Sequence, residues 1–141
     1  MNVYAESSAV LAWLLDEVSA PEVRRLLGAA GIIVASDLTL LECDRVLVRA
    51  TTLGELTEGE AADRRAQLSA AASHWHVLRI SQEVVDRGRQ PFPGEPIRTL
   101  DAIHLASALA ARSAIAGLAL LSLDDRIRHA AKQLGLTVAP V

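Results

Sequence analysis

The sequence has few of the residues that build disulfide scaffolds, membrane spans and stacking surfaces. Its 141 residues contain one cysteine, Cys43, so no internal disulfide can form, which fits a reducing compartment. No run approaches the roughly 18 uninterrupted apolar residues of a membrane span. Residues 1–6 lack the basic start and apolar stretch of a signal peptide, so we expect a cytoplasmic protein with no membrane partner.

Aromatic and lysine residues are also scarce. Aromatic residues make up 3% of the chain, which argues against extensive stacking on nucleic-acid bases. Lys132 is the only lysine and the net charge is −3, so the chain does not have the composition of a non-specific polyanion binder. Local contacts to phosphates would therefore fall to its arginines.

The chain has enough apolar material for one buried core. Hydrophobic residues make up 51% and charged residues 22%, without a repeat, a low-complexity segment or a linker, so we predict a single domain over 1–141. Short apolar runs predict strands at 2–5, 31–35, 75–80, 118–121 and 137–138. Helical patterns alternate with them, which predicts an α/β fold: a central, mostly parallel five-stranded sheet with helices on both faces.

Local signals place several helix ends. We expect Ser7 or Ser8 to cap the helix after the first strand, and Thr99 to cap the helix that follows Arg98. Residues 57–60 have the Thr-x-x-Glu pattern of a capping box. Three prolines and a glycine make residues 90–96 a loop.

Four acids fall near the ends of predicted elements. Glu6 follows the first strand, Asp124 follows the fourth, Asp101 lies in the first turn of a helix, and Glu42 lies about one turn into another. Crowded carboxylates repel one another unless a cation neutralises them, and hard cations such as Mg²⁺ or Mn²⁺ take carboxylate oxygens. A cation held in this way can deliver hydroxide to a phosphodiester.

Each acid also has an ordinary structural explanation. The partial positive charge at a helix N-terminus favours Asp101 where it stands. Glu42 has Arg45 and Arg49 at helical spacing as salt-bridge partners, and the other two acids are typical turn residues. Spacing alone leaves both explanations open.

Four motifs occur in a fixed order along essentially the whole chain. They are Tyr-Ala-Glu-Ser-Ser-Ala at 4–9, Leu-Leu-Glu at 40–42, Arg-Thr-Leu-Asp-Ala-Ile-His-Leu-Ala at 98–106, and Leu-Ser-Leu-Asp at 121–124, before a Gly-Leu-x-Val ending at 135–138. In this order they resemble the motifs of PIN-domain ribonucleases, specifically the VapC-type toxins of bacterial toxin-antitoxin (VapBC) pairs. The motif at 98–106 is the most specific.

The resemblance implies a metal-dependent endoribonuclease toxin. Such toxins cut structured RNA such as tRNA or rRNA, inhibit translation, and are neutralised by a cognate VapB-type antitoxin. The resemblance assigns Mg²⁺ or Mn²⁺ ligands and, around them, hydroxyl and acidic supporting side chains. The catalytic ligands that it implies are Glu6, Glu42, Asp101 and Asp124, and the supporting residues that it implies are Ser8, Ser122 and Asp125.

The same resemblance bears on the surroundings of the site. The family does not use His104 as a ligand, so we interpret it as structural support. Arginines close to the acids are candidate contacts to the RNA backbone, and each also has an ordinary explanation as a solvated surface charge. They are Arg98, Arg126, Arg128, Arg45 and Arg49. The antitoxin is expected to lay an amphipathic segment against the early helices and the 40–73 hairpin, and the toxin is expected to form a homodimer.

The sequence departs from the family pattern at Glu6, where aspartate is usual. Magnesium demands near-octahedral geometry, so one extra methylene bears directly on metal binding. A second hypothesis is therefore a catalytically weak or silent PIN scaffold that binds RNA or a protein partner. A third, a receiver-like signalling module, is disfavoured because Glu6 stands without a paired acid and Lys132 is the only lysine.

Overall fold

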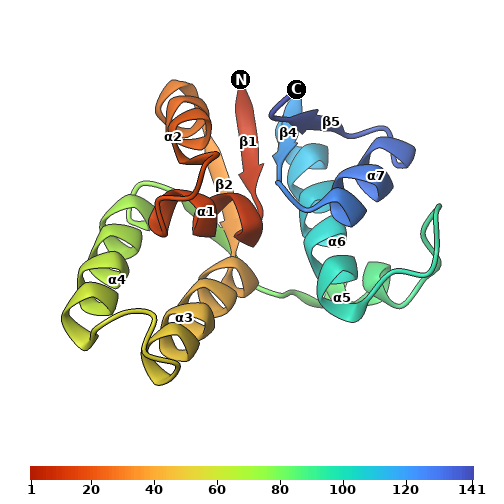
Figure 1. Ribbon diagram of the computed structural model, residues 1–141. Coiled ribbons are helices and arrows are strands. Elements are labelled where there is room, and N and C mark those ends of the chain that lie inside the picture. The colour runs from red at the N-terminus through yellow and green to blue at the C-terminus, as the bar shows by residue number, and fades with distance from the viewer.

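The structure is a computed structural model that describes residues 1–141. Its strands are β1 (Asn2–Ala5), β2 (Ile33–Ser36), β3 (His76–Leu78), β4 (Leu118–Leu121) and β5 (Thr137–Ala139). They form one sheet in the order β3-β2-β1-β4-β5, and all neighbouring pairs are parallel (Figure 1). The predicted fold class is therefore confirmed, with a sheet that is parallel throughout.

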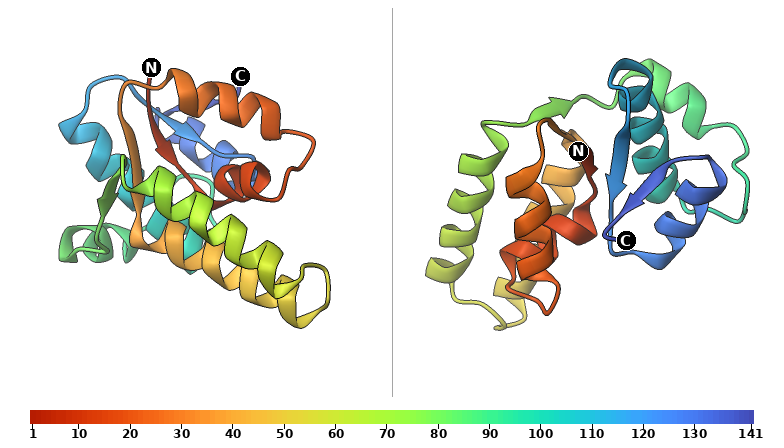
Figure 2. Two further views of the ribbon diagram at one scale, coloured as in Figure 1. Left: turned by 90° about the vertical axis from the view of Figure 1, so that its left-hand side faces the viewer. Right: turned by 90° about the horizontal axis from the view of Figure 1, so that it is seen from above.

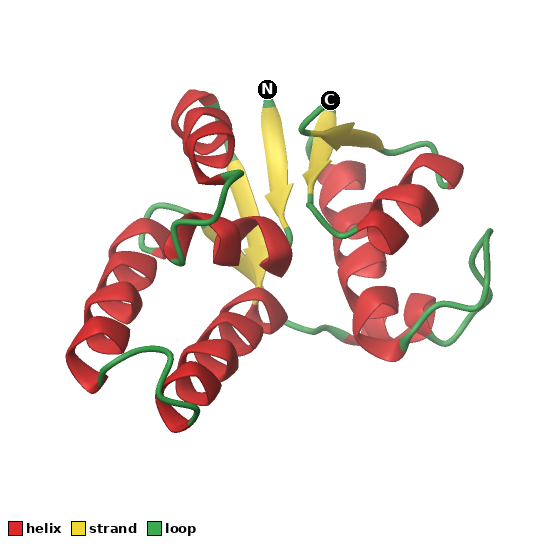
Figure 3. Cartoon of the chain, viewed as in Figure 1, coloured by secondary structure: helices red, strands yellow, loops and turns green.

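Helices connect the strands. They are α1 (Ser7–Leu14), α2 (Ala20–Ala29), α3 (Asp37–Thr52), α4 (Glu58–Ala72), α5 (Gln82–Gly88), α6 (Thr99–Ala114) and α7 (Asp125–Gln133). The loop predicted at 90–96 lies between α5 and α6 (Figure 3). No helix of the chain combines the length and the apolar character that a membrane crossing requires.

Both faces of the sheet are buried, which explains why its strands read as continuous apolar runs. Tyr4 and Leu120 point to the face covered by α5, α6 and α7. Val3 and Leu121 point to the opposite face, against α1 and α2. The α3–α4 hairpin packs beside α1 through a cluster that includes Cys43, and the two long helices lie side by side in Figure 2.

Two of the predicted helix caps are wrong. The N-cap of α1 is Glu6, whose side chain accepts from the backbone N–H of Ser8, so neither Ser7 nor Ser8 caps this helix. The N-cap of α6 is Arg98, without a side-chain hydrogen bond, and Thr99 is the first helical residue. The capping box over 57–60 is confirmed at the start of α4.

The order of the strands fixes where a site can form. The chain moves from β1 outward to β2 and β3, then returns to the other side of β1 with β4 and β5. Loops leaving the carboxyl ends of β1 and β4 therefore diverge and leave a crevice, where open parallel sheets bind their ligands. Glu6 directly follows β1 and Ser122 directly follows β4, so both stand at this switch point.

Candidate metal centre

Glu6 is held by groups from both sides of the switch point. Its side chain is nearly inaccessible, with the residue 4% exposed. Oε2 accepts from the Ser122 hydroxyl at 2.8 Å, from the Ser8 backbone N–H at 3.1 Å, and from the Ser8 hydroxyl. These donors fix one carboxylate oxygen, while Oε1 accepts no hydrogen bond and lies 3.9 Å from Nε2 of His104.

Glu42, in the second turn of α3, is held in the same way by two donors. Its Oε1 lies 2.6 Å from the Ser7 hydroxyl and 2.6 Å from Nε2 of His104. Since an ionised carboxylate only accepts, both neighbours donate to it. The other ring nitrogen of His104, Nδ1, lies 2.9 Å from the Tyr4 hydroxyl. His104 thus anchors Glu42 to the buried β1 strand.

These contacts decide the ionisation of Glu42. Burial acts to raise the pKa of the carboxyl, but the hydrogen bonds from His104 and Ser7 and the attraction of His104 outweigh it. The pKa of Glu42 therefore lies below its ordinary value, and the side chain is a carboxylate at neutral pH. The alternative that Glu42 forms a salt bridge with Arg45 or Arg49 is wrong, because its partners are His104 and Ser7.

Asp101 and Asp124 come from the starts of α6 and α7. Asp101 is half-buried in the first turn of α6, and its pKa is raised by burial and then by the nearby charge of Asp124, against the opposing effects of His104 and Arg98. Asp124 is the N-cap of α7: its Oδ1 accepts from the backbone N–H groups of Arg126 at 2.9 Å and Ile127 at 3.0 Å.

The tightest grouping of ligand-type atoms joins Glu6, Glu42 and His104, which offer atoms all within 4.8 Å of one another. Asp101 and Asp124 belong to no such compact group. Asp101 is still close enough to Asp124 and Glu42 for their negative charges to raise its pKa. Asp125 is exposed and has no side-chain hydrogen bond or ion pair.

The donor set fits a hard divalent cation. Each of the four acids keeps a carboxylate oxygen that receives no hydrogen bond: Oε1 of Glu6, Oε2 of Glu42, both oxygens of Asp101, and Oδ2 of Asp124. Carboxylate oxygens are what Mg²⁺ and Mn²⁺ take. Both ring nitrogens of His104 are already engaged, which agrees with its interpretation as structural support.

The arginines around the site divide into two kinds. Arg98, Arg126 and Arg45 are exposed and form no side-chain hydrogen bond or ion pair, so their guanidinium groups are free to bind a ligand. Arg128 instead donates to the carbonyl oxygens of Ser122 at 2.8 Å and Pro140 at 2.7 Å. In the structure this side chain ties α7 to the ends of β4 and β5, and its contact with RNA stays a prediction.

Sequence reasoning missed the buried polar chain behind the acids. Ser7 donates to Glu42, and the Tyr4 hydroxyl links His104 to Ser36 at 3.1 Å. A signal for Ser7 existed, since it is a hydroxyl residue directly beside Glu6 in the first motif. Nothing in the sequence pairs Tyr4 with His104, because only the fold brings β1 against α6.

Comparison with known proteins agrees with this geometry. The family model of the PIN domain matches residues 3–133. Ribonuclease VapC46 of Mycobacterium tuberculosis (strain ATCC 25618 / H37Rv) is 35% identical over 136 residues, covering 96% of this chain and 95% of that protein.

Two solved structures share the fold. Mycobacterium tuberculosis VapC20, described as a sarcin-ricin loop cleaving toxin, superposes with a TM-score of 0.66 at 14% identity, covering 91% of this chain and 94% of the other. VapBC2 from Rickettsia felis, bound to a promoter DNA fragment, superposes with a TM-score of 0.64 at 12% identity, covering 98% of this chain and 97% of the other. With the motifs, the parallel sheet and the acids at its switch point, these matches show that the chain belongs to the PIN-domain family, among its VapC-type members.

Proposed function

We propose that this protein is a Mg²⁺- or Mn²⁺-dependent endoribonuclease toxin that cuts structured RNA, such as tRNA or rRNA, and so inhibits translation. The observation that carries the proposal is that each of the four acids keeps a carboxylate oxygen without a hydrogen bond, in a chain 35% identical to a ribonuclease over 96% of its length. Glu6, Glu42, Asp101 and Asp124 are the proposed ligands.

A bound divalent cation would supply a hydroxide and stabilise charge on the phosphate. The chain's own residues hold and orient the ligands: Ser8 and Ser122 fix Glu6, while Ser7 and His104 fix Glu42.

No side-chain nucleophile is required. Cys43 is unsuited to that role because it is buried, and burial raises the pKa of its thiol to about 12.

Glu6 is compatible with this chemistry despite its extra length. Three donors hold its Oε2 and leave Oε1 free, so the longer side chain is anchored in place. We therefore place the active nuclease ahead of the catalytically weak or silent scaffold. The scaffold stays the alternative that a cleavage assay can select.

The proposed partners are a VapB-type antitoxin, an RNA substrate and a second copy of the chain. An apolar groove of about 410 Å³ lies between α1, α2 and the end of α4, and its walls include Trp13, Leu27, Ile33 and Trp75. This groove lies in the region where the sequence predicts an amphipathic antitoxin segment. A small antitoxin-like gene immediately upstream would support the proposed antitoxin partner. The proposed action on tRNA or rRNA places the protein in the cytoplasm.

The test is cleavage of total tRNA and rRNA by purified protein with Mg²⁺, Mn²⁺ or EDTA, beside Asp101→Asn. Activity should require a metal and should be lost in the variant. Asp63→Asn is the matched control, because Asp63 is an exposed aspartate on α4 without a side-chain partner. Equal activity of Asp101→Asn and wild type would overturn the proposal, and RNA binding without cleavage would select the scaffold.

A further inference from the structure

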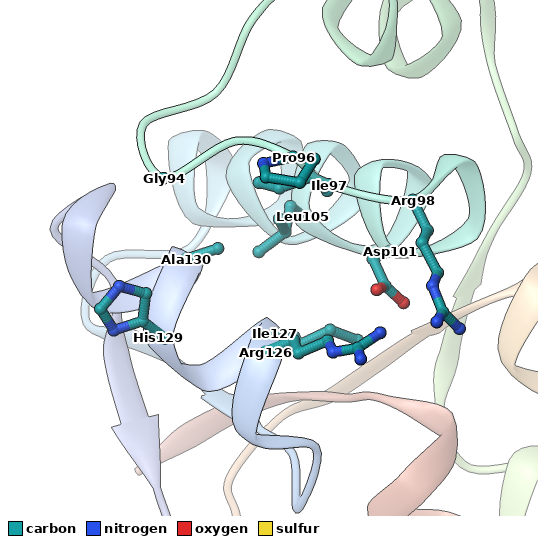
Figure 4. Close-up of a pocket in the computed structure, with 10 residues that line it drawn as sticks. All are labelled: Gly94, Pro96, Ile97, Arg98, Asp101, Leu105, Arg126, Ile127, His129 and Ala130. Carbon is teal, nitrogen blue, oxygen red and sulfur yellow. The ribbon is translucent and has the colours of Figure 1, made fainter.

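A pocket of about 550 Å³ opens beside Asp101, between the loop before α6, the first turns of α6 and the exposed side of α7. Figure 4 shows Asp101, Arg98 and Arg126 gathered at one end of it and His129 at the other. We propose that this pocket receives one unstacked nucleoside of the RNA, next to the phosphate that is cut, and so determines the nucleotide preference of the enzyme. The proposal rests on the proposed function, because it uses Asp101 as the marker of the scissile phosphate.

The loop that forms one wall of the pocket is held in place by its own hydrogen bonds. The carboxylate of Glu95 accepts from the backbone N–H groups of Phe92 at 2.8 Å and Ile97 at 2.7 Å, which closes the loop on itself. Phe92 is buried in the core, and the guanidinium of Arg87 lies 4.0 Å from its ring centroid. One wall of the pocket is therefore held in place before any ligand binds.

The floor is apolar and the rim is cationic. Leu105, Ile127 and Ala130 supply buried aliphatic surface, and Ile97 covers it from the loop. A volume of 550 Å³ falls within the range of about 300–1,000 Å³ typical of small-molecule sites. A planar base can lie on such a floor without aromatic stacking, which this pocket does not offer.

Charge favours a nucleotide over a cationic peptide. Asp101 is the only acid in the lining, against the guanidinium groups of Arg98 and Arg126. Neither arginine has an acid within 4.0 Å, so both can take phosphate oxygens, which accept from guanidinium groups.

The positions of the polar residues predict how the nucleotide is oriented in the pocket. The arginines share the end that holds Asp101, whereas His129 stands where the edge of the base would arrive (Figure 4). Sequence-specific RNA recognition commonly takes an unstacked base and reads its edge with hydrogen bonds. His129 is thus the candidate specificity residue, and the arginines are the candidate phosphate contacts.

The first experiment is metal-free and does not depend on catalysis. The four nucleoside 5′-monophosphates and inorganic phosphate are titrated in EDTA into full-length protein with labelled methyl groups. We expect the nucleotide of one base to shift the methyl signals of Ile97, Leu105 and Ile127 in preference to the other three. The variant His129→Ala should bind that nucleotide about tenfold more weakly. Methyl signals that shift equally for inorganic phosphate and all four nucleotides, or that do not shift at all, would overturn the proposal.

The second experiment maps the 5′ ends of cleaved RNA. His129→Ala should broaden the nucleotide preference beside the cut and raise KM more than it lowers kcat. Lys132→Ala is the matched control, since Lys132 is exposed on the same helix and does not line the pocket. An unchanged preference in His129→Ala would contradict the proposal.

The two experiments distinguish a failure of the proposed ribonuclease function from a failure of the proposed nucleoside pocket. If the wild type cuts no RNA, the proposed function fails while the titration still decides whether the pocket takes a base. If RNA is cut and no mononucleotide enters, the nuclease stands and the nucleoside pocket falls. Methyl shifts that appear only with a protein partner would assign the pocket to that partner and overturn the proposal.

Discussion

Nε2 of His104 lies 2.6 Å from Oε1 of Glu42, although the two residues are 62 positions apart in the chain. This contact joins α6 to α3 across the carboxyl edge of the sheet. The Tyr4 hydroxyl, 2.9 Å from Nδ1, adds β1 to the same connection. A histidine that binds no metal in our proposal therefore sets the position and the ionisation of a proposed ligand.

Replacing His104 should weaken metal binding. In His104→Ala, Glu42 loses its strongest donor, so its carboxylate is less well oriented and its pKa rises. Removal of a group that orients a ligand commonly costs about 10–100-fold in metal affinity, and we expect a loss in this range for Mn²⁺, measured by titration calorimetry. His76→Ala, at an exposed histidine on β3, is the control and should bind like wild type. Equal Mn²⁺ affinity in both variants would show that the contact does not support the site.

Glu42 should also make metal-free stability depend on acid pH. Its folded pKa lies below its ordinary value of 4.5, so the ionised group stabilises the fold above that pH. The contribution is lost as the pH falls through the lowered folded pKa. Chemical denaturation of wild type and Glu42→Gln between neutral pH and about pH 3 tests this, and the free energy of unfolding of the variant should fall less. Parallel pH profiles would contradict it.

The pKa of Asp101 should depend on the charge of Asp124. Burial and the charge of Asp124 raise the pKa of Asp101, so Asp124→Asn should lower that pKa toward its ordinary value. Arg98→Gln should move it the other way, because the guanidinium favours the charged form. The side-chain carboxyl carbon of Asp101, followed by NMR in metal-free protein, measures both shifts. A pKa that is the same in all three proteins would mean that Asp101 is electrostatically isolated.

Arg126 and Arg128 lie two positions apart on α7 and should behave differently. Arg128→Ala removes two hydrogen bonds to carbonyl oxygens, each worth about 1 kcal/mol, so stability should drop by about 1–3 kcal/mol. Arg126→Ala should leave the free energy of unfolding unchanged and weaken RNA binding, with a shallower salt dependence. Denaturant unfolding and RNA binding at several salt concentrations test the pair. The reverse pattern would exchange the two roles.

The fold could be predicted from the sequence because each element carries its own signal. The apolar runs at 2–5 and 118–121 are buried strands at those bounds, and Thr57 and Glu60 close the capping box their spacing predicts. The cap of α1 could not be predicted in the same way. Glu6, Ser7 and Ser8 all offer side-chain oxygens, and the choice of Glu6 depends on its other donor, Ser122, which lies 116 positions away.

The place of two candidate acids at the carboxyl edge of the sheet could be predicted from the sequence, but the groups that hold the acids could not. Glu6 and Asp124 follow strands, so the rule for parallel sheets places them at one edge. The pairing of Glu42 with His104 depends on how α3 and α6 cross, and helical spacing suggested Arg45 or Arg49 instead. Arg128 shows the same limit: its partners include Pro140, beyond the end of β5, which no local pattern on α7 indicates.

Glu6 is the residue on which the proposed activity depends most. Glu6→Gln keeps the size of the side chain and an acceptor oxygen for Ser8 and Ser122, but it removes the charge that a metal ligand needs. We expect metal-dependent RNA cleavage to fall at least about tenfold, with circular dichroism unchanged. Glu17→Gln, at an exposed glutamate after α1, is the control and should keep full activity. If Glu6→Gln cleaved RNA like wild type, Glu6 would be a helix cap and nothing more, and the other three acids would have to hold the metal without it.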